Sequence, residues 1–234
     1  MNRRHFLLTT SGAAAAAAAA GPSSAAAAEP LAEHRITSVA GVHVRQPWPR
    51  VVGKNSRLDV HGRGPTVAAL VIRTDQGASG WGMLRGGPKE IEACEERLGG
   101  KKLSELIAPG TGLLDPAFAP CDIALHDLAG VILGQPVWKM LGGAQPAANR
   151  VYSGMIYFDD LEPPDQPAGI DKVLENCRWD HDHGYRQLTP TLEGVTCGED
   201  DVDFGDNRIK DGLFHPSSKP GFGLSLRKPV PAGP

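Results

Sequence analysis

This chain of 234 residues has little of what marks several specialised classes of protein. Aromatic residues make up only 6% of it, and the formal net charge is −3 with no dense lysine and arginine face. Nucleic-acid binding requires a basic surface, so that balance excludes it. Long apolar runs are also absent apart from an alanine-rich stretch near the N-terminus. The hydrophobic share of 41% is nevertheless large enough for a folded core.

Cysteine is scarce as well. Cys94, Cys121, Cys177 and Cys197 are too few for a disulfide scaffold, and their spacing does not match a zinc knuckle. We therefore expect buried or free thiols in the folded chain.

Residues 1–28 are typical of an export signal. Arg3 and Arg4 precede a short apolar stretch and an alanine run, and small residues near Ala28 suit cleavage. The segment resembles a twin-arginine signal, which predicts an exported protein in the periplasm or outside the cell. The alanine run is weakly hydrophobic and is interrupted by glycine and Pro22, so it does not predict a membrane span.

Residues 33–149 carry the pattern of an α+β domain. Segments 36–46, 66–74 and 78–83 have the composition and alternation of strands, and the turn at 75–77 predicts an antiparallel hairpin. We expect a three-stranded antiparallel meander. Helical patterns follow at 88–98, at 101–108 and at 116–133, with a one-turn helix at 137–141.

The helix expected at 116–133 carries an apolar stripe. Ala124, Leu128, Val131 and Ile132 are spaced to share one face, and Gly134 is expected to end the helix. Asp127 lies among these residues, and we expect its carboxylate to bond a backbone amide or an arginine of a neighbouring element.

The pattern of the predicted elements changes after Asn149. A strand at 150–158, a helix at 169–184 and a strand at 185–188 predict one βαβ unit. The remainder is rich in loops, with one strand expected at 222–226 before a proline-rich tail. We expect the segment around 220–226 to dock beside the first domain.

Residues 122–143, DIALHDLAGVILGQPVWKMLGG, resemble a family signature. The segment is similar to the one that ends the N-terminal capping domain of the mandelate racemase and muconate-lactonising family in the enolase superfamily. The order of elements from residue 35 to 188 agrees with that family. The resemblance implies a capping domain at 33–149, followed by an incomplete TIM-type barrel remnant at 150–195 and a C-terminal return segment at 196–234.

The resemblance also implies a chemistry. Intact relatives hold Mg²⁺ through three acidic residues of the barrel, and a lysine or histidine abstracts the proton alpha to a carboxylate. Racemases, dehydratases and cycloisomerases use this step. The family's Lys-x-Lys pair on the second barrel strand falls here on Thr189 and Thr191. A hydroxyl cannot replace an amine base.

The residues after Pro190 are similar to the last barrel strand and return segment of the family. We therefore expect the second strand to be joined to the eighth near Leu188, with the barrel between them missing through deletion or an error in the gene model. The resulting hypothesis is an isomerase or lyase by descent that is not catalytic alone and takes no cofactor. Glu193 is a weak catalytic candidate because it would be an isolated carboxylate. Completion of a barrel by several chains leaves homo-oligomerisation open.

An alternative function is a non-catalytic, exported binding or interaction module. The resemblance places two loops of the capping domain over the barrel mouth, where they would contact an acid sugar or another small carboxylate. Arginine suits that role because its guanidinium binds carboxylates in a bidentate manner. The candidate residues are Trp48, Arg50, Arg57, His61 and Arg85.

Two polar clusters invite a metal interpretation. In WDHDHG, residues 179–184, a helix would place His181 and His183 about 200° apart, which does not suit one ion. GEDDVDFGDN, residues 198–207, lacks the spacing of a calcium loop. We expect both clusters to be solvated and predict no metal site.

Overall fold

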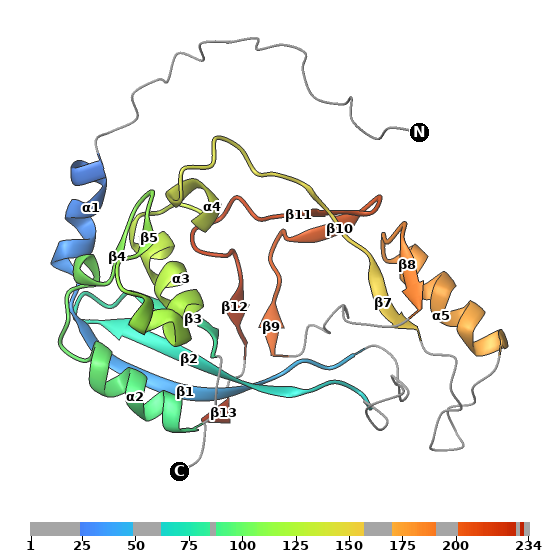
Figure 1. Cartoon of the computed structure of the whole chain (residues 1–234), viewed down its shortest axis with the longest axis horizontal. Helices are drawn as coiled ribbons and strands as arrows, with labels where there is room; N and C mark the ends of the chain where they lie inside the picture. The colour runs from blue at the N-terminus through green and yellow to red at the C-terminus, as the bar shows by residue number, and fades with distance from the viewer. Residues whose placement is uncertain are drawn as a thin grey trace, which may run out of the picture.

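The structure is a computed structural model that describes residues 24–48, 62–84, 88–156, 170–190, 201–227 and 230–231. Helices cover an antiparallel sheet, and a small parallel strand pair lies beside them (Figure 1). The helical elements are α1 (Ser24–Glu33), α2 (Pro88–Leu98), η1 (Leu103–Glu105), η2 (Pro116–Cys121), α3 (Asp122–Ile132), α4 (Val137–Met140) and α5 (Ile170–Asp182). Here η marks a 3₁₀ helix.

The strands fall into several small sheets. They are β1 (Ile36–Arg45), β2 (Thr66–Thr74), β3 (Ser79–Met83), β4 (Ile107–Ala108), β5 (Gly112–Leu113), β6 (Asn149–Arg150), β7 (Ser153–Ile156), β8 (Leu188–Pro190), β9 (Val202–Asp203), β10 (Arg208–Lys210), β11 (Leu213–His215), β12 (Ser225–Leu226) and β13 (Val230–Pro231).

The main sheet has the order β13-β1-β2-β3 and is antiparallel throughout. Its register pairs Val39 with Ile72 and Leu70 with Gly82. The expected three-stranded meander is therefore confirmed. β13, from the C-terminal end of the chain, adds a strand that the sequence did not predict.

The two faces of the sheet carry two different cores, because successive side chains of a strand point to opposite faces. Ile36, Leu70 and Ile72 belong to the larger core, which α2 and α3 cover. Leu31 of α1 is fully buried in it, so this core begins before residue 33. The opposite face holds Val42, Val44, Ala69 and Val71, and Val202 of the C-terminal part packs against it.

The helix expected at 116–133 is two helices in the structure. Pro116 and Pro120 lack a backbone N–H, and the stretch they occupy forms the 3₁₀ helix η2, which Asp115 caps by accepting from Ala117 N at 2.8 Å. α3 follows from Asp122. The helical hydrogen bonds continue as far as Leu133, whose N donates to Ala129 O at 3.0 Å. The region ends at Gly134, as expected.

The predicted apolar stripe is wrong at Val131. Ala124 and Leu128 are buried as expected, but Val131 is 39% exposed. The reason is the length of β3. Gly82 lies against Ala124 and Gly80 against Leu128, and the strand begins at Ser79, so the last turn of α3 extends past it. The buried face instead includes Leu125, Asp127 and Ala129.

The expectation of buried or free thiols is wrong for two of the cysteines. Cys94 and Cys121 form a disulfide, with their Cα atoms 6.8 Å apart. Their separation of 27 residues does not reveal that α2 and η2 lie side by side. Cys177 on α5 is a free thiol. Cys197 lies outside the described residues.

The βαβ unit is confirmed. β7 and β8 are parallel neighbours that pair Ser153 with Leu188, and α5 lies between them in the sequence (Figure 1). The single strand expected at 150–158 is divided, because Arg150 in β6 pairs with Leu213 of β11 before β7 begins. The strands of the described ranges do not close a barrel.

Residues 201–227, which we call the return segment, contain more structure than the expected loops. β10 and β11 form a hairpin whose turn uses Asp211 and Gly212, both at positive φ, and β12 pairs with β9. Gly221 N donates to Gln135 O at 3.0 Å, and Val137 N donates to Gly221 O at 2.9 Å. Docking beside the first domain is thus confirmed. None of the described helices has the length and hydrophobicity to cross a membrane.

Candidate functional site

Asp127 forms the junction of three elements. Its carboxylate, buried on α3, accepts from Trp81 N of β3 at 3.0 Å and from Phe222 N of the return segment at 2.9 Å. Burial raises the pKa of Asp127 above its ordinary value, while the N–H groups of Phe222 and Trp81 act to lower it. The expected bond to a backbone amide is confirmed. Both oxygens hold the fold together, which leaves neither aimed at a substrate.

A cavity of about 240 Å³ opens beside this junction, between β3, α3 and the return segment. Trp81, Met83, Ile123, Phe204, Phe222 and Leu224 form its apolar walls. Arg45 and Gln46 supply polar groups at the end of β1. Asp127 is the acidic residue of the lining, and its oxygens already accept two N–H bonds. The cavity therefore offers shape and apolar surface without a poised acid or base.

Arg45 holds the return segment against the end of β1. Asp201 accepts from the Arg45 backbone N at 2.8 Å and from its Nε and Nη2 atoms at 3.1 and 2.8 Å. The Asp201 side chain is buried, while that of Arg45 is largely exposed. Sequence reasoning missed this pair, because 156 residues separate its members and no local motif marks either.

A second network joins the loop between β9 and β10 to the loop between β11 and β12. The Ser217 hydroxyl donates to the Asp206 carboxylate, and Ser217 N donates to Asn207 Oδ1 at 2.8 Å. Trp138 Nε1 donates to Ser217 O at 3.0 Å, which ties the second loop to α4. The Ser217 hydroxyl lowers the pKa of Asp206 below its ordinary value, and the positive charge of Lys219 lowers it further. This serine therefore serves as a hydrogen-bond donor that links the two loops.

The substrate-loop candidates lie mostly outside the described residues. Of the five, the structure describes only Trp48; Arg50, Arg57, His61 and Arg85 belong to the stretches it leaves out. Trp48 N donates to Arg63 O at 2.8 Å, and Gln46 N donates to Pro65 O at 2.9 Å. These bonds continue the β1–β2 pairing and hold the base of the loop that the sequence analysis singled out.

The β7–α5–β8 unit includes one of the two residues at which the resemblance places the family lysines. Thr189 lies in β8, beside β7, while Thr191 and Glu193 lie outside the described residues. Ser153 Oγ at the start of β7 donates to Asp180 Oδ2 on α5 at 2.7 Å, and both residues are buried. That bond fixes the helix against the strand, which is a packing role.

The polar clusters have partners of their own. His183 Nδ1 donates to Trp179 O at 2.7 Å and the two rings stack, and both His181 and His183 are exposed. Of the acidic loop, Asp203 lies 3.8 Å from Arg227, and residues 198–200 are outside the described ranges. Within those ranges no group of three or more histidine, cysteine, aspartate or glutamate side chains could hold a metal ion. The described residues therefore do not fit the Mg²⁺ site that the resemblance implies for intact relatives.

Comparison with known proteins gives sequence relatives for part of the chain. It is 30% identical over 145 residues to the D-galactonate dehydratase of Ralstonia nicotianae, a match that covers 55% of this chain and 37% of the relative. The D-galactonate dehydratase of Variovorax paradoxus is 33% identical over 139 residues, with 52% and 36% covered. The chain thus spans little more than a third of these curated relatives. No protein-family model matches it.

Solved structures share the fold. A variant of galacturonate dehydratase from a Geobacillus species, complexed with Mg, superimposes with a TM-score of 0.56 at 23% identity, covering 69% of this chain and 42% of the other. A mandelate racemase/muconate lactonizing protein from Geobacillus sp. Y412MC10, complexed with magnesium and tartrate, gives 0.55 at 22% identity, with the same two shares. The chain is thus similar in sequence to D-galactonate dehydratases and shares its fold with solved structures of the mandelate racemase and muconate-lactonising type, the fold that the resemblance of its 122–143 segment implied.

Proposed function

We propose that this chain descends from Mg²⁺-dependent dehydratases of sugar acids and that it does not abstract the proton alpha to a carboxylate by itself. Similarity to D-galactonate dehydratases supports the descent. The observation that carries the second part is the short path from barrel to return segment. β8 ends at Pro190 and β9 begins at Val202, where the chain already contacts the main sheet.

That path leaves no room for the strands on which the reaction depends. A closed (β/α)₈ barrel takes about 250 residues, and its catalytic groups come from the ends of several strands. In this family Mg²⁺ stabilises the negative charge that develops on the substrate carboxylate. Thr189 occupies the first lysine position, and a hydroxyl of ordinary acidity cannot take up the proton at neutral pH.

The test is exchange of the alpha proton. The full chain is incubated with D-galactonate or D-galacturonate and Mg²⁺ in D₂O, and loss of the alpha-proton signal is followed by NMR. The D-galactonate dehydratase of Ralstonia nicotianae serves as the positive control. We expect exchange no faster than in buffer with Mg²⁺ alone. Protein-dependent exchange that disappears on chelation of the metal would contradict the proposal.

A second candidate function is the binding of a sugar acid without turnover. The observation in its favour is the ordered base of the loop that leaves β1, held by Trp48 N on Arg63 O and by Gln46 N on Pro65 O. The stretch of sequence between these bonded residues carries Arg50 and Arg57, whose guanidinium groups suit a carboxylate.

Calorimetry on the full chain with D-galactonate distinguishes the two candidates. Binding without exchange, weakened at least tenfold in R50A/R57A and unchanged in R73A, would establish the binding function. Arg73 is a matched control because it is an exposed arginine on β2 of the same domain. Absence of binding at millimolar ligand would reject this second candidate and leave the first in place.

A further inference from the structure

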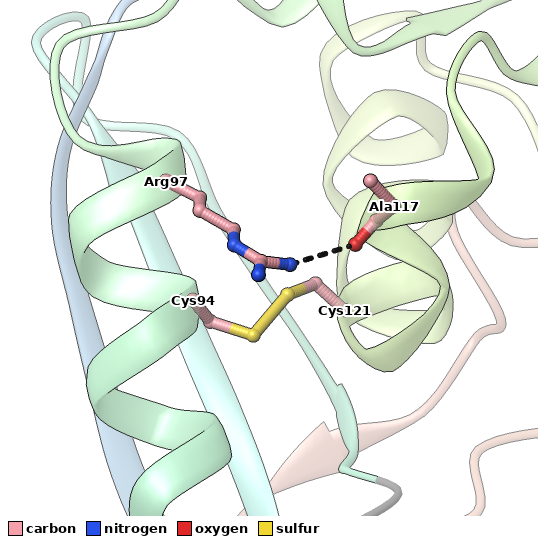
Figure 2. Close-up of a disulfide and its surroundings, with 4 residues drawn as sticks. All are labelled: Cys94, Arg97, Ala117 and Cys121. Carbon is pink, nitrogen blue, oxygen red and sulfur yellow. Dashed lines mark hydrogen bonds between the residues drawn. A yellow bond between two sulfur atoms is a disulfide. The ribbon is translucent and has the colours of Figure 1, made fainter.

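The Cys94–Cys121 disulfide joins two helical elements that lie over the same face of the main sheet. Cys94 lies on α2, and Cys121 is the last residue of η2, directly before α3 (Figure 2). Both cysteines are almost fully buried and belong to the larger core. α2 packs on β1, whereas α3 packs on β3, at the far side of β2. The bond therefore ties together two helices that contact different strands.

A second contact crosses the same junction. Arg97, one turn after Cys94 on α2, donates from Nη1 to Ala117 O of η2 at 3.3 Å (Figure 2). The disulfide is thus part of a built interface between α2 and η2. Cross-linking residues that are 27 positions apart removes conformations from the unfolded chain and favours the folded one.

The cysteines also line a cavity of about 210 Å³. Lys89, Glu90 and Arg97 contribute to its walls. The cavity lies beside the disulfide and offers a small disulfide reagent an approach to this side of the two residues.

We propose that the disulfide is a structural bond acquired from a thiol–disulfide oxidant outside the cytoplasm, and that the capping domain depends on it. A thiolate of one cysteine attacks the oxidant disulfide and releases one oxidant thiol. The other cysteine then attacks the mixed disulfide and releases the second oxidant thiol. Two protein thiols become one disulfide, and the oxidant disulfide becomes two thiols.

The disulfide and the N-terminal segment independently indicate a location outside the cytoplasm. Cytosolic thiol pools keep such pairs reduced, whereas exported proteins retain disulfides. The Arg3-Arg4 segment at the N-terminus resembles an export signal. This inference stands apart from the proposed function, because it concerns stability and location and holds whether or not the chain binds a sugar acid.

The first experiment locates the bond. The full chain with its own N-terminus is produced in a bacterial host, and thiols in the exported and retained fractions are alkylated before and after reduction and mapped by mass spectrometry. We expect a linked Cys94–Cys121 peptide in the exported fraction, and alkylation of both residues without prior reduction when R3K/R4K keeps the chain inside. Free Cys94 and Cys121 in the exported fraction, or an equally complete bond in the retained variant, would overturn the proposal.

The second experiment measures dependence on the bond in a folded protein. In the variant C177S/C197S, Cys94 and Cys121 are the remaining two cysteines of the chain. We expect reduction to lower its thermal midpoint by about 5–10 °C. The C94A/C121A variant should melt at the lower temperature with or without reductant. If C94A/C121A does not fold at all, that result and the effect of reducing C177S/C197S together show that the domain depends on the disulfide. An unchanged midpoint of C177S/C197S on reduction would refute the structural role.

Discussion

Asp127 accepts hydrogen bonds from backbone groups 46 and 95 positions away in the sequence. A buried carboxylate is costly unless hydrogen bonds compensate its desolvation. Here two N–H donors provide that compensation, and in doing so they fix the positions of β3 and the return segment relative to α3. Asp127 therefore has the structural role that the sequence analysis expected.

The substitution D127N tests this role. The amide keeps the shape of the side chain but turns a donor toward one of two N–H groups that need an acceptor. We expect a loss of about 1–3 kcal/mol in the free energy of unfolding, measured by urea denaturation. D122N, on the same helix but half exposed, should cost about 0.5 kcal/mol or less. Equal losses in the free energy of unfolding from D127N and D122N would argue against this structural role of Asp127.

Asp206 has a pKa below its ordinary value of 3.8, chiefly because the Ser217 hydroxyl donates to it. A carboxyl whose folded pKa is lowered stabilises the protein above the unfolded pKa, and this contribution is lost as the pH falls through the folded pKa. We expect S217A to raise the pKa of Asp206 toward 3.8. The free energy of unfolding should then fall less as the pH is lowered through the acidic range. Carboxyl ¹³C NMR titration measures the shift directly. S218A should leave it unchanged, because Ser218 acts on Asp206 through its backbone.

At the scale of elements, α3 and the return segment approach with almost no side chain between them. A methyl group on Gly130 would lie 2.8 Å from Gly221 Cα, and one on Gly221 would lie 2.3 Å from Asp127 Oδ1. The hydrogen bonds of Gly221 with Gln135 and Val137 hold this crossing. The glycine at position 130, within the 122–143 segment, therefore allows a close contact between α3 and the return segment.

Gly221 and Gly134 form a matched pair for a test. Both have positive φ, at 66° and 62°, but a methyl group at 134 would meet open space. G134A should cost about 1–2 kcal/mol for the left-handed backbone alone. G221A should cost that amount plus the displacement of Asp127, about 2–4 kcal/mol in total. Urea denaturation of both variants measures the difference, and equal costs would mean that the crossing adapts freely.

At the scale of the whole molecule, the return segment and the capping domain form one packed body. Val202 and Phe204 of the return segment cover the sheet face that α2 and α3 leave open. Asp201 and Asp127 then fix the segment at two separate points. The β7–α5–β8 unit is attached through β6 and β11. Catalysis in the relatives is a property of a closed barrel, so the proposed inactivity belongs to this scale as well.

Much of this architecture was predictable from local pattern. Strand alternation and turn residues predicted the meander, and the segment at 122–143 predicted the fold that the chain shares with solved structures of the mandelate racemase and muconate-lactonising type. The 116–133 helix was predicted as one element, although Pro116 and Pro120 lack the backbone N–H that an α-helix needs and their stretch forms a 3₁₀ helix. β13 and the β10–β11 hairpin were missed because very short strands have too few residues to show an alternation.

The sequence by itself determined the α+β class and the βαβ unit, because those depend on side-chain type and local period. Only the tertiary structure decided that Cys94 meets Cys121, that Arg45 meets Asp201 and that Asp127 meets Phe222. Each pair joins elements far apart along the chain. Their meeting follows from how helices and strands pack on the two faces of one sheet, which no local spacing records.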